Sequence, residues 1–105
     1  MASTDRRAKI LAEAWLGDAV LSLYVRSLIL RTNGKLDSAE FERLTSNRAL
    51  AVFGDPSEVE ADIGRVYERE GLTAAFLWIE ANLMPVFRKQ EQKRMRANKP
   101  APAVS

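Results

Sequence analysis

The sequence predicts an all-α fold, and three observations support that class. Apolar residues from Ile10 to Leu28 recur at the three- and four-residue spacing of an amphipathic helix. Turn and capping signals such as Asn33-Gly34 and Asp55-Pro56 divide the rest of the chain into segments of helical length. No segment alternates apolar and polar residues as a half-buried strand would. The chain of 105 residues is long enough for one domain with a core, but not for two.

The first helix is expected to start at a cap on Thr4 or Asp5 and to continue to about Leu30. The segment TNGK, residues 32–35, follows as a turn, because Asn-Gly is a strong turn signal. We assign residues 1–97 to one helical domain and expect residues 98–105 to be a disordered tail.

Each later helix is expected where a capping residue precedes helix-forming residues. These helices are SAEFERL, starting at Asp37 or Ser38; RALAVF, capped by Ser46 or Asn47 and ended by Gly54; the segment capped by Asp55 and ended by Gly71; and AAFLWIEANLM, capped by Thr73. Pro85 is expected to kink or interrupt the last helix before VFRKQEQKRMRAN, because proline lacks the backbone N–H that a helix interior uses.

The composition excludes several kinds of chemistry. The chain has no cysteine and no histidine, so it has no disulfide, no thiolate, no usual general base and no common zinc ligand. Catalysis would use carboxylates, Lys, Ser, Thr or Tyr, with a hard metal ion where one is needed. No apolar run reaches about 18 residues without a charge, and MASTDRRAK is not followed directly by an apolar core of the kind that a signal peptide has. We therefore expect no membrane association and a cytoplasmic protein.

Positive charge is concentrated near the C-terminus. Residues 88–105 carry six basic side chains and one acid, whereas the whole chain has a net charge of +2, which leaves −3 for residues 1–87. A basic segment can contact nucleic acid phosphates. We identify four candidate RNA-binding residues: Arg88, Lys89, Lys93 and Arg94. The alternative is a solvated helix end without a ligand.

Two segments combine a glycine with a carboxylate in a helical context. Asp18 follows Gly17 and shares a helix face with mainly apolar residues of the kind found in protein cores. Glu60 precedes Gly64 by one helical turn. Glycine costs about 1 kcal/mol in a helix interior, and close approach of another backbone is the usual compensation. If the two helices cross at Gly17 and Gly64, the carboxylates of Asp18 and Glu60 can meet.

Two adjacent carboxylates repel each other unless one is protonated or a cation lies between them. With only oxygen ligands, Mg²⁺ or Mn²⁺ is the natural cation. The pattern therefore allows a metal site at Asp18 and Glu60. It also allows an ion pair between Asp18 and an arginine such as Arg48, with Glu60 an ordinary acid in the first turn of its helix.

Three segments resemble the ribonuclease III family. EAWLGDAVLSLYV resembles its signature helix, FERLTSNRALAVFG resembles the segment that follows, and VEADIGRVYEREGLTAAFLWIEANLMPVF resembles its second motif. The three lie in the family's order and span roughly residues 11–87.

The resemblance implies an all-helical, compact ribonuclease III-like domain that forms a homodimer. It implies a Mg²⁺-dependent (or Mn²⁺-dependent) endoribonuclease for double-stranded or structured RNA, with a ribosomal RNA precursor as one candidate substrate. Asp18 and Glu60 match the family's catalytic and metal-binding acids, and Trp15 matches an aromatic residue near the dimer interface.

Two acidic positions of the full-length enzymes are replaced, by Ala14 and Ser57. Glu13 and Glu58 do not substitute for them, because each is turned well away from its neighbouring acid around the helix. This reduction resembles the Mini-III branch, whose members are catalytic domains alone. The connection at residues 54–57 is also shorter than in the family. The alternative function is a catalytically weak or inactive, dimeric RNA-binding or ribosome-associated module.

Overall fold

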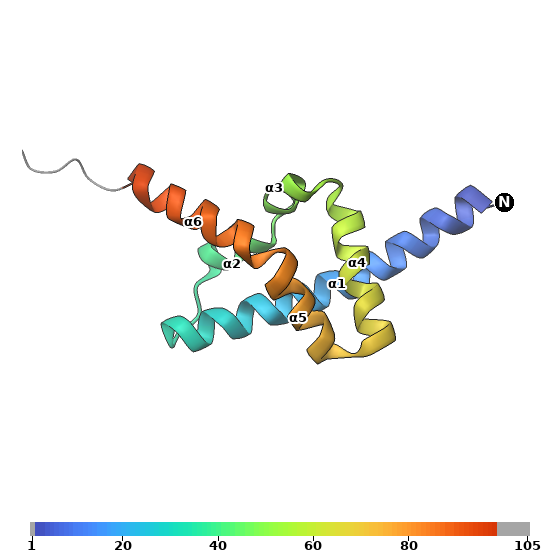
Figure 1. Ribbon diagram of the computed structural model, residues 1–105, viewed down its shortest axis with the longest axis horizontal. Helices are drawn as coiled ribbons and strands as arrows, with labels where there is room; N and C mark the ends of the chain where they lie inside the picture. The colour runs from blue at the N-terminus through green and yellow to red at the C-terminus, as the bar shows by residue number, and fades with distance from the viewer. Residues whose placement is uncertain (1, 99–105) are drawn as a thin grey trace, which may run out of the picture.

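Helices account for nearly all of residues 2–98, the part of the chain that the computed structural model describes (Figure 1). The elements are α1 (Ala2–Asn33), α2 (Ser38–Thr45), α3 (Asn47–Leu50), the 3₁₀ turn η1 (Ala51–Phe53), α4 (Pro56–Glu70), α5 (Leu72–Asn82) and α6 (Met84–Asn98). These residues contain no strand, so the all-α prediction is confirmed for them. Over the same range, every helix is too short or too polar to cross a membrane.

Helix α1 is longer than the sequence predicted. It begins at Ala2, so Thr4 and Asp5 lie inside its first turns and the predicted cap at either residue is wrong. Asp5 still stabilises the helix, because a negative charge near the N-terminus interacts favourably with the helix dipole. The helix continues past Leu30 until Gly34, whose φ of 73° ends it and whose N–H donates to the Leu30 carbonyl at 3.0 Å.

Side-chain caps start three of the later helices where they were predicted. Asp37 accepts a hydrogen bond from the Glu40 N–H at 3.0 Å, Ser46 from Ala49 at 3.1 Å, and Asp55 from Ser57 at 2.9 Å. The predicted cap on Thr73 is wrong. Gly71, at a φ of 95°, ends α4 and directly precedes α5, which leaves Thr73 in the first turn of α5.

The predicted interruption at Pro85 is confirmed. Helix α5 ends at Asn82 and α6 begins at Met84, with Leu83 between them. Pro85 has no N–H to donate to the carbonyl one turn earlier, so the α5 hydrogen-bond ladder cannot continue through it. Helix α6 extends to Asn98, one residue beyond the domain boundary expected at residue 97. The rest of the expected tail, residues 99–105, lies outside the described residues.

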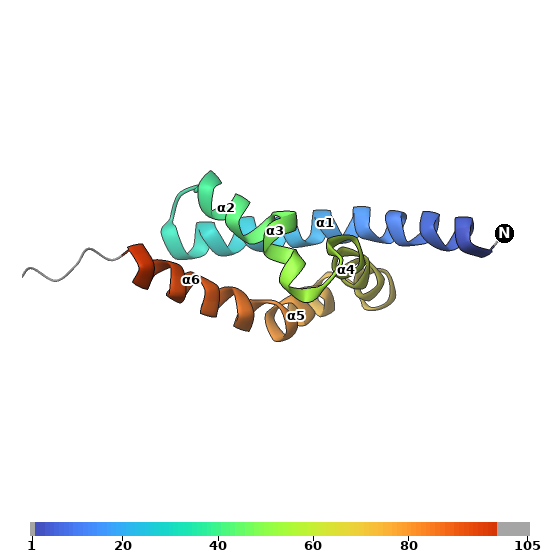
Figure 2. The same cartoon turned by 90° about the horizontal axis from the view of Figure 1, so that it is seen from above.

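One apolar core holds the helices together. Seen from above, α1 and the α5–α6 pair lie on opposite sides of the molecule, and both contribute to this core (Figure 2). Its most deeply buried side chains come from five helices and are at most 1% exposed: Leu21 and Val25 of α1, Leu50 of α3, Ile63 of α4, Ile79 of α5 and Phe87 of α6. This burial fixes α4 across α1 and so sets the geometry of the site below.

Candidate functional site

Helices α1 and α4 cross in direct backbone contact at two glycines (Figure 1). A Cβ atom added to Gly17 would lie 1.7 Å from the carbonyl oxygen of Glu60, and one added to Gly64 would lie 2.0 Å from the carbonyl oxygen of Glu13. No side chain fits at either position. The predicted close approach of the two helices is therefore confirmed, and it explains why both helices have glycine in their interiors.

The crossing brings the carboxyl groups of Asp18 and Glu60 together, as the glycine pattern predicted. Partial burial, then a hydrogen bond to Asp18 and the negative charge of Asp18, raise the pKa of Glu60 to about 7. Near neutral pH, Glu60 is thus divided between a protonated form, which shares its proton with Asp18, and an ionised form that faces a second negative charge.

The two carboxyls differ in environment. Asp18 projects from the edge of the apolar face of α1 and is exposed, although Leu21 and Val25 on the same face are buried. The sequence placed Asp18 on a helix face of core-type residues, but in the structure Asp18 is exposed and Glu60 is the half-buried carboxyl. The reason is that Glu60 lies where α4 packs against α1 at Gly17, whereas Asp18 lies on a side of α1 that is open to solvent.

Among the described side chains, no Lys or Arg forms an ion pair with Asp18 or Glu60. Arg48, the partner considered from the sequence, is exposed and lines a groove between α2–α3 and α6 instead. The ion-pair alternative for Asp18 is therefore contradicted. The pair remains without a positive neighbour at salt-bridge distance within residues 5–97.

The other flank of the crossing has the opposite arrangement. Glu13 is only 6% exposed, and Arg65 of α4 neutralises it through an Nη1–Oε2 contact of 2.6 Å. Arg65 also pairs with Asp62, and Lys9 approaches Glu13 at 3.9 Å. This cluster links α1 to α4 and confirms that Glu13 points away from Asp18. Sequence analysis missed Arg65, although its place one turn after Asp62 indicated at least that local pair.

The positions where two family acids are replaced cannot add charge to the site. Ala14 is buried and carries no polar group on its side chain. Ser57 lies in the first turn of α4, where its backbone N–H donates to the capping carboxylate of Asp55. Glu58 is exposed and lines a surface hollow with Arg6. Within a single chain, Asp18 and Glu60 are therefore the carboxyls of this site among the described residues.

Trp15 is 79% exposed on α1, and Leu11, one turn earlier, is 48% exposed. Their spacing of four residues puts them on one side of the helix. Trp15 is therefore accessible to a partner, as an interface residue must be.

The four basic residues predicted to bind RNA all lie on α6. Arg88, Lys89, Lys93 and Arg94 are exposed, and Arg94 pairs with Glu91. Helix α6 leads away from the α1–α4 crossing, so one chain does not bring these four residues to Asp18 and Glu60 (Figure 1). A ligand that contacts both the basic residues of α6 and the carboxyls of Asp18 and Glu60 would therefore have to be an extended molecule.

Comparison of the chain with protein-family models, with curated proteins and with solved structures finds no match. The likeness to ribonuclease III thus rests on sequence motifs alone, and the function has to be argued from the site.

Proposed function

We propose that this protein is a Mg²⁺-dependent endoribonuclease that cleaves double-stranded or structured RNA as a homodimer. The observation that carries the proposal is the meeting of Asp18 and Glu60 at the crossing of Gly17 and Gly64, with no basic side chain among residues 5–97 at salt-bridge distance from either carboxyl. These are the segments that resemble the two acidic motifs of the ribonuclease III family.

The donor set fits a hard divalent cation. The described residues contain no group of three or more ligand-type side chains, so each chain offers two carboxylates here. Mg²⁺ is commonly held by one or two carboxylates together with water and substrate phosphates, rather than by a complete protein cage. A cation between Asp18 and Glu60 would also remove the repulsion that raises the pKa of Glu60.

The protein's own residues have distinct tasks in this proposal. Asp18, at the exposed edge, and Glu60, at the half-buried position, hold the ion beside an open surface on which RNA can lie. The bound ion supplies positive charge that stabilises the charge developing on the scissile phosphate. The glycines fix the spacing of the carboxyls through the backbone, and Trp15 takes part in pairing two chains.

Cleavage of a long RNA duplex tests the proposal. The parent protein and the variants Asp18→Asn and Glu68→Gln are incubated with duplex in Mg²⁺, in Mn²⁺ or in EDTA. Glu68 is an exposed carboxylate of the same helix as Glu60, so its variant controls for the loss of one charge. We expect cleavage by the parent and Glu68→Gln in either metal, and none by Asp18→Asn or in EDTA.

Metal binding is measured independently by thermal unfolding. An ion at ten times its dissociation constant stabilises the folded state by about 1.4 kcal/mol. This stabilisation should raise the melting temperatures of the parent and of Glu68→Gln. The melting temperature of Asp18→Asn should rise much less. An identical response of all three proteins would contradict a site at Asp18.

One observation favours a second function. The site has two carboxyls where the full-length family enzymes have four, and Ala14 and Ser57 stand at the other two positions. A site with only two of the four carboxyls is what we expect of a dimeric RNA-binding or ribosome-associated module that does not cleave RNA. RNA binding by the parent, with no cleavage in either metal, would support this function instead.

A further inference from the structure

A second charged site lies between α2–α3 and α6, away from the α1–α4 crossing. It is a groove of about 640 Å³ into which three arginines from three helices project: Arg43 of α2, Arg48 of α3 and Arg94 of α6. Two acids, Glu42 and Glu91, also line it, which leaves a net charge of +1. We call these three arginines and Glu91 the arginine groove.

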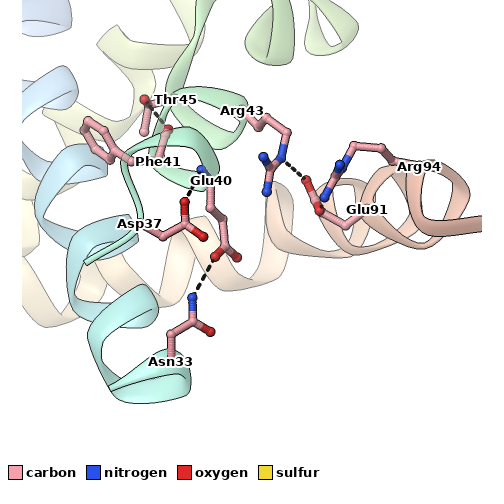
Figure 3. A network of polar contacts seen from close by, with 8 residues as sticks. All are labelled: Asn33, Asp37, Glu40, Phe41, Arg43, Thr45, Glu91 and Arg94. Carbon is pink, nitrogen blue, oxygen red and sulfur yellow. Dashed lines mark hydrogen bonds and ion pairs between the residues drawn. The ribbon is translucent and has the colours of Figure 1, made fainter. Parts of the chain in front are cut away.

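Glu91 organises two of the arginines (Figure 3). One of its carboxylate oxygens accepts from Nε of Arg43 at 3.2 Å, and the other accepts from Nε of Arg94 at 3.4 Å. Both contacts use Nε, so these two hydrogen bonds do not occupy the terminal Nη donors. The Arg43 and Arg94 side chains are 33% and 43% exposed, and both line the groove.

Attachment of α6 to α2 accounts for only part of this arrangement. The Arg43–Glu91 pair alone would connect the two helices. Arg94 adds a second guanidinium to the same carboxylate, and Arg48 adds a third that forms no ion pair with any described side chain. Glu42 and Glu91 offset two of the three positive charges, so the groove keeps one net positive charge that an anion can neutralise.

We propose that the arginine groove binds the sugar–phosphate backbone of RNA. Guanidinium groups donate two parallel hydrogen bonds to phosphate oxygens, so fixed arginines suit a phosphodiester better than mobile lysines do. Arg88 and Lys93 of α6 are exposed as well and add positive charge to the same helix. The proposal rests on the proposed function, and it places the grip on RNA at a site separate from Asp18 and Glu60.

A nucleic acid fits the surroundings better than a membrane does. Within the described part of α6, Met95 is the one large apolar side chain that is exposed. A helix that binds a membrane surface needs a continuous apolar face, which α6 lacks. The repeated charges of a phosphate backbone, by contrast, can contact both the groove and the basic surface of α6.

The test measures binding of a duplex RNA of about two helical turns to the full chain over a series of salt concentrations, in EDTA to prevent cleavage. The main variant is Arg48→Gln, because Arg48 has no ion-pair partner among the described side chains and its loss should not disturb the fold. Arg94→Gln is the second variant. Arg69→Gln, an exposed arginine near the end of α4, is the matched control for loss of one positive charge.

Each groove variant should weaken binding about 3- to 10-fold. Because one phosphate contact is lost, the negative slope of log affinity against log salt should become shallower by about 1. Arg69→Gln should change binding less than about 2-fold. Arg48→Lys, which keeps the charge but not the guanidinium, should fall between the parent and Arg48→Gln.

Equal binding by Arg48→Gln, Arg94→Gln and Arg69→Gln would overturn the arginine groove, while cleavage by the parent in Mg²⁺ would leave the proposed function intact. Failure of the parent both to bind and to cleave RNA would overturn both proposals. A labelled polyglutamate that binds more tightly than RNA, and loses affinity in Arg48→Gln, would assign the groove to an acidic protein partner instead.

Discussion

Removing one charge from the Asp18–Glu60 pair should stabilise the metal-free protein at neutral and alkaline pH. The folded-state pKa of Glu60, about 7, lies above its ordinary value of 4.5, so the folded protein binds this proton more tightly than the unfolded chain does. The resulting stability is fully present below about pH 4.5 and is lost as the pH rises through 7. Glu60→Gln should remove most of that loss, whereas Asp18→Asn, which removes the repulsion but not the burial of Glu60, should remove only part of it.

The size of the effect follows from the pKa and its causes. The difference between the ordinary pKa of 4.5 and the folded-state pKa of about 7 corresponds to a change in the free energy of unfolding of at most about 3 kcal/mol. Solvent screening at this partly exposed group reduces that change to about 1–2 kcal/mol. Glu60→Gln removes the whole cost of ionisation. Asp18→Asn leaves the burial of Glu60, the largest cause of its raised pKa, and should recover only about half. In a domain of this size, 1 kcal/mol changes the melting temperature by about 4–8 °C.

The assay is thermal unfolding in EDTA, followed by circular dichroism at pH 5 and at pH 8. The chain has no histidine, so few other groups titrate in that interval. The parent should melt at a lower temperature at pH 8 than at pH 5, while Glu60→Gln should change little. Glu68→Gln should behave like the parent. A parent that is more stable at pH 8, or variants that melt at lower temperatures than the parent at pH 8, would refute the reasoning.

Three further predictions follow from the same structure. Trp15 is expected at a two-fold interface, so the parent should sediment as a dimer at tens of micromolar, a rough working range for weak interfaces; Trp15→Lys should be a monomer, whereas Leu77→Lys, on the exposed face of α5, should remain a dimer. Truncation after Phe87 should weaken RNA binding and flatten its salt dependence; an unchanged salt slope in a folded protein would reduce α6 to a solvated helix end. Gly17→Ala should destabilise the fold by about 2 kcal/mol or more, measured by urea unfolding, although the same change in an open helix stabilises it by about 1 kcal/mol.

The sequence predicted the helices well where local chemistry determines their ends. Asp37, Ser46 and Asp55 cap helices because their side chains accept hydrogen bonds from N–H groups two or three residues later. Local reasoning failed at Thr73. It is a good capping residue, but Gly71 turns the chain first, at a positive φ that a residue with a side chain rarely adopts.

The candidate site was predictable only in part. The glycine and carboxylate positions of two helices indicated the crossing, because an interior glycine calls for a close neighbour. The exposure of Asp18 and the salt bridge between Glu13 and Arg65 were not predictable, since they depend on which side of α1 is covered by α4. Arg94 was predicted to bind RNA, but its assembly with Arg43 and Arg48 into the arginine groove was not predicted. The residues of the groove come from three separate helices, and no spacing along the chain connects Arg43 with Glu91.

The contrast between the two flanks of the α1–α4 crossing distinguishes a structural role from a ligand-binding one. Glu13 and Asp18 lie on the same helix, and each meets a side chain of α4 near the Gly17–Gly64 contact. Arg65 neutralises Glu13, so that pair holds the helices together with its charges satisfied. Asp18 meets a second acid instead, an arrangement that opposes folding at neutral pH unless a cation binds. The same crossing thus contains both a stabilising pair and a destabilising one, and the metal ion that we propose would account for the second.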